Sequence, residues 1–122
     1  MERRWCPDRG DLLWLEFGTR SGHEQSGRRP ALVLSPLAYN RKVGLALLCP
    51  VTSQVKGYPF EVFLPDGYGI TGVILSDQIK SMDWRGRRAT KAGAAPAAVV
   101  LEVQAKIRLL IGGGSFEEPT TR

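Results

Sequence analysis

A series of short apolar runs, each ended by proline, glycine or a polar cluster, limits the folds that this chain can adopt. The run 31–35, for example, lies between Pro30 and Pro36. Apolar runs of this length with such boundaries are typical of buried strands. The 122 residues suit one domain, so we expect a single mainly β, α+β domain. The expected strands are residues 11–17, 31–35, 45–51, 60–64 and 71–75, with a last one somewhere within 84–91.

Two of these runs carry further information about the sheet. In 11–17, Leu13 and Leu15 share one face and Trp14 lies on the other, so both faces are expected to be covered at least in part. Pro50, near the end of 45–51, predicts an edge position or a bulge because proline has no N–H for the ladder.

Helical signals appear twice. Ser35 suits an N-cap and Pro36 the first helical position, so residues 36–42 are expected to form one short helical turn. A longer helix is expected between Pro96 and Gly112. Its apolar positions recur at helical spacing: Val99, Val100, Val103, Ile107, Leu110 and Ile111.

Short strands at close spacing followed by one helix describe a small SH3-like β-barrel with a C-terminal helix packed on it. We expect residues 1–112 to form this domain. Residues 113–122, which are glycine-rich and then acidic, are expected to be a disordered tail.

The net charge and the cysteines reduce the number of possible functions. The 17 Lys and Arg against 12 Asp and Glu give a net charge of +5, which favours anionic partners, nucleic acid first. Cys6 and Cys49 form no CxxC pair and the chain has one histidine, so no metal site and no cofactor are expected. Two cysteines fit free buried thiols in the cytoplasm, with a Cys6–Cys49 disulfide as the alternative. No signal peptide and no apolar run of the ~20 residues that span a bilayer are seen, so we expect no membrane partner.

The loop before the second expected strand concentrates reactive side chains. His23, Glu24 and Gln25 lie within seven residues of Arg29, and Pro30 biases Arg29 towards an extended backbone. A cation, a carboxylate, an imidazole and an amide so close together suggest a site that handles an anion. The alternative is a solvated surface loop.

Polar side chains also follow other expected strands. Thr52, Ser53, Gln54 and Lys56 come after 45–51, and Asp77, Gln78 and Lys80 come after 71–75. The segment 84–91, which includes Arg87, carries four positive charges and no acid. These groups suit nucleic-acid binding, or they tie down strand ends and solvate a basic face. The aromatic side chains of Trp14, Phe60 and Trp84 suit base stacking, although core packing is the more common role.

In this order and spacing, the segments resemble the MazF/PemK family of toxin endoribonucleases over nearly the whole chain. The segments that carry the resemblance are Gly10-Asp11, Glu24-Gln25-Ser26-Gly27-Arg28-Arg29-Pro30, Pro50-Val51-Thr52-Ser53, residues 56–62 and Asp77-Gln78-Ile79-Lys80-Ser81.

The resemblance implies the toxin of a toxin–antitoxin pair, a ribosome-independent enzyme that cuts single-stranded RNA, chiefly mRNA, at short sequences. It implies a homodimer and a cognate antitoxin, for which we expect an acidic disordered tail. It also implies cleavage by the adjacent 2′-hydroxyl, which leaves a 2′,3′-cyclic phosphate and a 5′-hydroxyl without a metal. The same fold is shared by CcdB toxins.

The family's catalytic pair falls on Arg29 and Thr52, and its loop glutamate falls on Glu24. An arginine is a poor base because its pKa lies above ~12, so we assign Arg29 to charge stabilisation and Thr52 to holding the phosphate. Glu24 is the candidate base and His23 its rival. The branch of the family with Gly-His-Glu-Gln in this loop has an arginine where this chain has Leu75. We therefore do not carry over that branch's full arrangement of catalytic acid, base and stabiliser. The expected RNA-binding residues are Gln25, Arg28, Ser53, Gln54, Lys56, Asp77, Gln78, Lys80 and Arg87.

Two other functions remain as alternatives. One is a non-catalytic toxin of the CcdB type that binds DNA gyrase, although such toxins use an aromatic C-terminal end and residues 112–122 lack tryptophan. The other is an RNA-binding barrel without catalysis. The cleavage sequence depends on loop conformation and base-edge hydrogen bonds, which residue spacing does not give.

Overall fold

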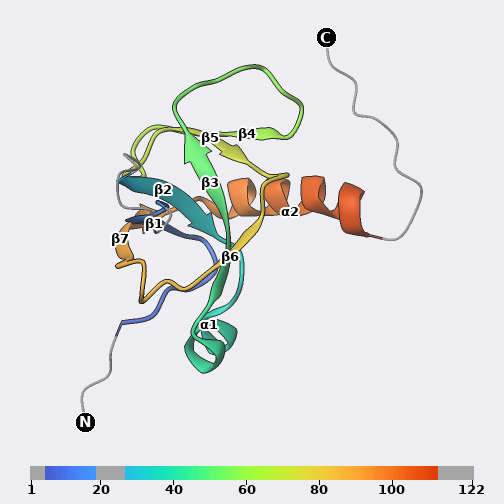
Figure 1. Ribbon diagram of the computed structural model, residues 1–122. Coiled ribbons are helices and arrows are strands. Elements are labelled where there is room, and N and C mark those ends of the chain that lie inside the picture. Colours follow the sequence, from blue (N-terminus) through green and yellow to red (C-terminus); the bar gives the residue numbers. More distant parts are fainter. Residues whose placement is uncertain (1–4, 19–26, 113–122) are drawn as a thin grey trace.

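The computed structural model describes residues 5–18 and 27–112, and these form one sheet with two helices (Figure 1). The expected tail at 113–122 lies outside the described residues. In chain order the elements are β1 (Asp11–Glu16), β2 (Arg28–Val33), α1 (Leu37–Val43), β3 (Ala46–Thr52), β4 (Glu61–Leu64), β5 (Gly72–Leu75), β6 (Lys80–Met82), β7 (Thr90–Ala94) and α2 (Ala97–Ile111).

The strands pair antiparallel in the order β4-β5-β3-β2-β1-β7, and β6 pairs with β3. The sheet curves into a half-barrel, and α2 runs across one of its faces (Figure 1). The expected mainly β fold with a C-terminal helix is therefore confirmed. Because α2 and β4 are in contact, the helix closes the hydrophobic core on that side.

The expected edge position for Pro50 is wrong, because β3 lies inside the sheet. Pro50 stands opposite Ala31 of β2. On its other side β3 changes partner, from β6 at residues 46–48 to β5 at Val51 and Thr52. The missing N–H of Pro50 therefore falls in the gap between two partner strands, where no ladder bond is lost.

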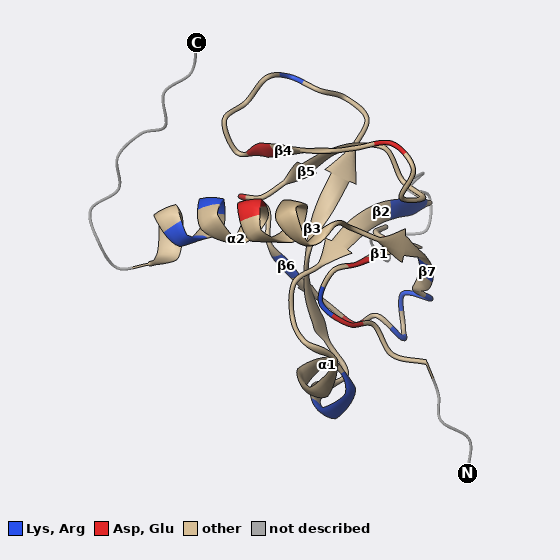
Figure 2. Cartoon of the chain, turned by 180° about the vertical axis from the view of Figure 1, so that it is seen from behind, with Lys and Arg blue, Asp and Glu red and all other residues tan. Residues whose placement is uncertain are grey.

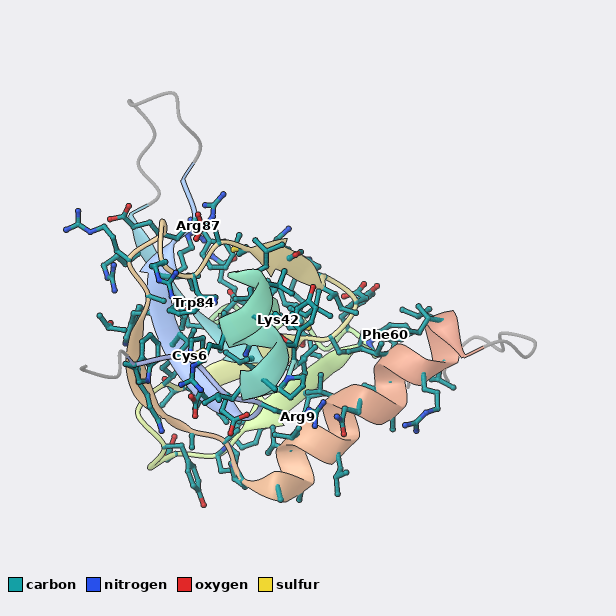
Figure 3. The ribbon with its side chains drawn as sticks, turned by 90° about the horizontal axis from the view of Figure 1, so that it is seen from below. Cys6, Arg9, Lys42, Phe60, Trp84 and Arg87 are labelled. Carbon is teal, nitrogen blue, oxygen red and sulfur yellow. The ribbon has the colours of Figure 1, made fainter. Side chains whose placement is uncertain are left out.

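Each face of the sheet carries its own core. Leu12 and Leu32 pack with Val103 of α2 on one face. Leu13 and Leu15 pack with Trp84 on the other. The alternation expected for the first strand is confirmed, and Trp14 remains 38% exposed. Phe60 and Trp84 are both buried, as their more common role predicts, and Phe60 lies beside α2 (Figure 3).

The end of the sheet differs from the expectation. β6 was not predicted, because three residues of the composition Lys-Ser-Met give no recognisable alternation. The strand expected within 84–91 begins only at Thr90. The residues before it form a turn in which Arg88 has a positive φ of 58°.

The apolar stripe of α2 is buried at Val99, Val100, Val103 and Ile107. The helix continues to Ile111 as expected, but the last two apolar positions are accessible: Leu110 and Ile111 are 47% and 73% exposed. The last turn of α2 extends beyond the strands (Figure 1), so the described chain covers it only in part. Lys106 donates to the Pro59 carbonyl at 2.7 Å and ties α2 to the loop between β3 and β4.

The short helix α1 forms where expected, but the predicted cap does not. Pro36 is the N-cap residue, and the Leu37 N–H at the start of the helix donates to Oδ1 of Asp8 at 2.9 Å, not to Ser35. The Ser35 hydroxyl instead donates to Oδ1 of Asn40 at 2.5 Å and accepts the Leu47 N–H at 2.8 Å. Asn40 is fully buried and organises the contacts around α1.

Both cysteines are free and buried. Burial, together with the nearby Asp77 carboxylate, raises the pKa of Cys49 to about 12. Burial also raises the pKa of Cys6. In the part of the chain that the structure describes, no helix has the length and apolarity to cross a membrane.

Candidate functional site

Strand register brings Arg29 and Thr52 together. Ala31 of β2 stands opposite Pro50 of β3, and continuing this antiparallel register by two residues sets Arg29 opposite Thr52. Residues directly opposite on neighbouring strands point to the same face with Cβ atoms about 5 Å apart. Both residues also line one surface hollow of ≈ 480 Å³. The two proposed catalytic side chains, 23 positions apart in the sequence, are therefore neighbours.

A second hollow of ≈ 540 Å³ adjoins the first, since Thr52 lines both. We call the two together the cleft. The first hollow is lined by Trp14, Arg28, Arg29, Pro30, Val51, Thr52, Ser53, Gly69, Ile70 and Thr71, and the second by Thr52, Gln54, Lys56, Tyr58, Glu61, Leu75, Asp77 and Gln78.

Thr52 is held at the centre of this cleft by its neighbours. Its Oγ1 accepts the Gln54 N–H at 3.1 Å, which leaves the hydroxyl hydrogen free to donate to a ligand. Behind it, β5 approaches so closely at Gly72 that a Cβ there would run into the Thr52 carbonyl oxygen. Gly72 has φ 129°, a conformation that glycine adopts readily. The backbone of Thr52 is therefore packed closely against β5, and its side chain is held by the Gln54 N–H.

The loop between β3 and β4 forms one wall of the cleft and is pinned twice. The Glu61 carboxylate accepts the N–H groups of Lys56 and Gly57, at 3.1 Å and 3.0 Å. The Tyr58 hydroxyl donates to Oδ2 of Asp77 at 2.7 Å, and this hydrogen bond raises the pKa of Tyr58. The loop therefore presents the Lys56 cation on an ordered backbone.

Asp77 has one oxygen in use and one without a partner. Tyr58 bonds Oδ2, whereas Oδ1 is buried and no described residue donates a hydrogen bond to it. A buried acceptor without a donor is unfavourable. Asp77 is thus an acceptor in the wall of the cleft whose hydrogen bonding is incomplete.

Two of the arginines expected to bind RNA are engaged in holding strands together. Arg28 donates from Nη2 to the Trp14 carbonyl and to Oγ1 of Thr90, both at 3.0 Å, and so spans β1 to β7. Arg87 donates to the Glu16 carbonyl at 2.9 Å and lies outside the cleft lining. Lys80, on β6, is exposed but also lies outside the lining.

The cleft gathers seven of the other predicted residues and adds one that the sequence did not single out. Arg29, Thr52 and Ser53 line the first hollow, and Gln54, Lys56, Asp77 and Gln78 line the second with Thr52. Tyr58 was not among the predicted site residues, although it lies within the 56–62 segment that carried the family resemblance. His23, Glu24 and Gln25 lie outside the described residues, so their roles stay predictions.

The chemistry of the cleft suits a phosphodiester. A guanidinium is always charged at neutral pH and offers a planar fork of donors that matches phosphate oxygens. Figure 2 shows basic residues at the start of β2, beside the cleft, and in the turn before β7. No group of three or more His, Cys, Asp or Glu side chains that could hold a metal ion occurs within residues 5–18 and 27–112.

Comparison with known proteins gives consistent matches. Residues 8–111 match the family described as the PemK-like, MazF-like toxin of type II toxin–antitoxin systems. The endoribonuclease toxin MazF of Escherichia coli (strain K12) is 51% identical over 112 residues, covering 92% of this chain and 100% of that protein. The endoribonuclease PemK of Escherichia coli is 33% identical, covering 91% of this chain and 86% of that protein.

Solved structures agree with these matches. A crystal structure of MazE-MazF (Form-II) from Deinococcus radiodurans matches with a TM-score of 0.86 and 55% identity, covering 91% of this chain and 100% of the matched chain.

Proposed function

The chain belongs to the PemK-like, MazF-like toxins of type II toxin–antitoxin systems, and we propose that it is an endoribonuclease that cuts single-stranded mRNA at short sequences without the ribosome. The observation that carries this proposal is the convergence of Arg29 and Thr52 across β2 and β3 in an open cleft. The CcdB-type alternative finds no support among the relatives, which are endoribonucleases.

The proposed reaction is an internal displacement at phosphorus. The 2′-oxygen attacks the adjacent phosphorus, the bond from phosphorus to the 5′-oxygen breaks, and a 2′,3′-cyclic phosphate and a 5′-hydroxyl result. The 2′ proton passes to a base, and the leaving 5′-oxygen takes up a proton. Arg29 stabilises the negative charge that builds on the phosphoryl oxygens, and Thr52 holds the phosphate through its hydroxyl. Glu24 is our candidate base and His23 its rival.

A single experiment tests this function. The purified protein is incubated with a long RNA in EDTA, and the fragment ends are analysed chemically and by sequencing. We expect discrete fragments with 2′,3′-cyclic phosphate and 5′-hydroxyl ends, and the sequenced ends give the cleavage motif. Products with 3′-hydroxyl ends, or activity abolished by EDTA, would overturn the mechanism. Intact RNA would favour a non-catalytic toxin or binding module.

Asp77 and Gln78 are proposed to read bases. Both line the cleft beyond Thr52, and Oδ1 of Asp77 is an acceptor without a donor among the described residues. The Asp77 carboxylate can only accept hydrogen bonds, so it would read a base that presents an N–H to it, whereas the Gln78 amide offers both a donor and an acceptor.

Asp77→Asn should therefore lower cleavage at the natural motif about tenfold and change the set of sequences cut. The new amide has nearly the same shape but places a donor where an acceptor stood, and a mismatched buried pair costs ~1–3 kcal/mol. Sequencing of fragment ends from one RNA pool measures both effects. Asp66→Asn, which removes the same charge from an exposed turn between β4 and β5, is the matched control. An unchanged motif and rate would rule out Asp77 as a base reader.

The protein is further proposed to form a homodimer through the exposed end of α2. An apolar groove of ≈ 480 Å³ runs between this helix end and the sheet, and its lining includes Leu34, Leu47, Ile79, Ile107 and Ile111. Ile111 is 73% exposed. Contiguous exposed apolar surface of this kind marks an interaction site, and a second copy is the occupant that the family implies.

Ile111→Lys should weaken self-association at least tenfold, because a desolvated cation in an apolar interface is costly. Leu101→Lys is the matched control: Leu101 is 63% exposed on the same helix and does not line the groove. Sedimentation equilibrium at micromolar concentration measures the effect. A monomeric natural protein, or equal losses in both variants, would contradict the proposed interface.

The second proposed partner is a cognate antitoxin with an acidic disordered tail. The net charge of +5 and the cations Arg29 and Lys56 at the cleft attract an acidic peptide for the same reason that they attract RNA. Antitoxin and RNA should then exclude one another, and both should bind more weakly as salt rises. A toxin that acts on mRNA works in the cytoplasm, where we place it.

A further inference from the structure

A second aromatic site lies outside the cleft. Trp5, Trp84, Arg85, Arg88 and Ala89 line a hollow of ≈ 240 Å³, which we call the tryptophan hollow. The rings of Trp5 and Trp84 meet edge to face, with centroids 5.8 Å apart and planes at 84°. Trp84 is buried, and its Nε1 donates to the Asn40 carbonyl at 3.2 Å, so its ring is fixed. Trp5 is 42% exposed and rests against this fixed ring.

The hollow is positively charged. The Arg85 guanidinium lies 4.6 Å from the centroid of the Trp84 ring. Arg88 is paired with Glu16 at 3.7 Å, but its side chain remains 74% exposed. Asp83 is the acid in the adjoining turn, and its Oδ1 already accepts the N–H groups of Arg85 and Gly86. Two accessible guanidinium groups therefore flank an exposed indole.

The tryptophan hollow faces the same side of the sheet as Arg29. Arg29 pairs with Leu15 across β2 and β1, and Leu15 belongs to the core cluster that contains Trp84. The turn that carries the hollow is fixed to the end of β1, because the Glu16 N–H donates to the Arg87 carbonyl and Arg87 donates back to the Glu16 carbonyl, both at 2.9 Å. In Figure 3, which shows the molecule from below, Trp84 lies between Arg87 and Cys6.

Only β1 separates Arg29 on β2 from this turn, and neighbouring strands are about 4.8 Å apart. An RNA strand held at Arg29 therefore has the hollow within reach of a few nucleotides. A cationic surface that continues from a phosphate-binding site and carries an exposed aromatic ring is the usual arrangement for single-stranded nucleic acid.

We propose that the tryptophan hollow binds an unpaired nucleotide that flanks the cleavage site, with its base stacked on Trp5 and its phosphate held by Arg85 and Arg88. The proposal rests on the endoribonuclease function proposed above and extends its RNA footprint beyond the cleft. Stacking on an aromatic ring accepts every base, so the hollow adds affinity for flanking RNA without adding sequence specificity.

An acidic peptide is the other class of ligand that such charges attract. It would pair with Arg85 and Arg88 but would leave the exposed face of Trp5 without a flat partner. A nucleotide uses the ring and the cations at once, and for this reason the structure favours it.

Binding of uncleavable RNA tests the proposal. The cleavage motif is synthesised with 2′-O-methyl groups, which remove the attacking hydroxyl, either bare or with six uridines added on one side or the other. The variants are Trp5→Ala and Arg85→Gln, and the matched controls are Tyr39→Ala and Lys42→Gln, which change exposed residues on α1. Dissociation constants are measured by fluorescence anisotropy, after thermal unfolding has shown that each variant is folded.

We expect the natural protein to bind RNA with one of the two flanks more tightly than bare RNA. Trp5→Ala should raise the dissociation constant for the flanked RNA about tenfold, in line with the loss of stacking by one base. Arg85→Gln should remove a smaller, salt-dependent part. Binding of bare RNA should stay unchanged, as should binding by the two α1 controls.

Three results would overturn the proposal. The first is that neither flank increases the affinity for RNA, and the second is that the variants lose equal affinity for bare and flanked RNA. The third is that the variants bind a synthetic glutamate-rich peptide more weakly but bind flanked RNA as the natural protein does. The last would assign the hollow to a protein partner. Failure of the endoribonuclease proposal looks different, because the natural protein would then leave long RNA uncut whatever the flanking uridines do to binding.

Discussion

Arg29→Lys should lower the rate of RNA cleavage about 10²–10³-fold while RNA binding is largely kept. Lysine preserves the positive charge but replaces the planar fork of donors by a single ammonium, which cannot bind two phosphoryl oxygens in fixed geometry. Loss of one preorganised donor to a transition-state oxyanion typically costs this factor. Single-turnover cleavage of a motif-containing RNA gives the rate, and the 2′-O-methyl form of the same RNA gives the affinity.

Arg28→Lys is the matched control for this substitution. Arg28 is the preceding residue in β2, but its guanidinium bonds the Trp14 carbonyl and the Thr90 hydroxyl. We therefore expect a modest loss of stability from this variant and little change in the chemical step. If Arg28→Lys and Arg29→Lys lose the same rate, or if Arg29→Lys keeps its rate, Arg29 is not the transition-state stabiliser.

The base is tested in the same assay. If Glu24 accepts the 2′ proton, Glu24→Gln loses most of the rate and retains RNA binding, because the amide keeps the size of the side chain but not its basicity. His23→Ala should then leave activity largely intact. The opposite pattern would assign the base to His23.

Asn40→Leu should destabilise the fold by at least ~3 kcal/mol, equivalent to a fall in Tm of ~10 °C or more for a domain of this size. Asn40 is fully buried, and its Nδ2 donates to the carbonyls of Pro7 and Ser35 at 2.8 Å and 3.0 Å. Its Oδ1 accepts the Ser35 hydroxyl at 2.5 Å. Leucine has a similar size but removes the donor to the two carbonyls and the acceptor of the Ser35 hydroxyl, and each buried group left unsatisfied costs ~1–3 kcal/mol.

Denaturant unfolding at one fixed protein concentration measures this loss, since a dimer would make the apparent stability depend on concentration. Lys42→Leu introduces the same side chain at an exposed position of the same helix and should change stability by less than ~0.5 kcal/mol. Asn40→Asp should also be destabilising, because a carboxylate cannot donate to Pro7 or Ser35. A loss below ~1 kcal/mol for Asn40→Leu would contradict the role given to this residue.

Local sequence patterns were sufficient to predict most of the elements. The alternation in 11–17, the apolar run before Ser35 and the helical spacing from Val99 to Ile107 each depend on residues only a few positions apart, and all three predictions are confirmed. The family motifs also located Arg29 and Thr52, and the structure places the two residues in one cleft.

Three other features do not follow from local patterns. Leu110 and Ile111 follow the helical period but are exposed, because the period gives the face of a helix and not the length of sheet that covers it. Arg87 lies in a basic segment that suits RNA binding, yet its guanidinium donates to the carbonyl of Glu16, 71 residues away in the sequence. Asn40 lies in a polar stretch and is nevertheless fully buried.

Short-range geometry and composition were therefore enough to predict most of the strands and helices, the sign of the charge and the residue types available for RNA chemistry. Which of those residues come into contact depends on how the strands and loops are arranged in three dimensions. The register between β2 and β3 sets Arg29 opposite Thr52, and the β3–β4 loop brings Tyr58 to Asp77. The turn at Trp84, pinned to the end of β1, adds a second aromatic site on the same face as Arg29. Register and burial depend on contacts between residues far apart in the chain, and local periodicity carries no information about these contacts.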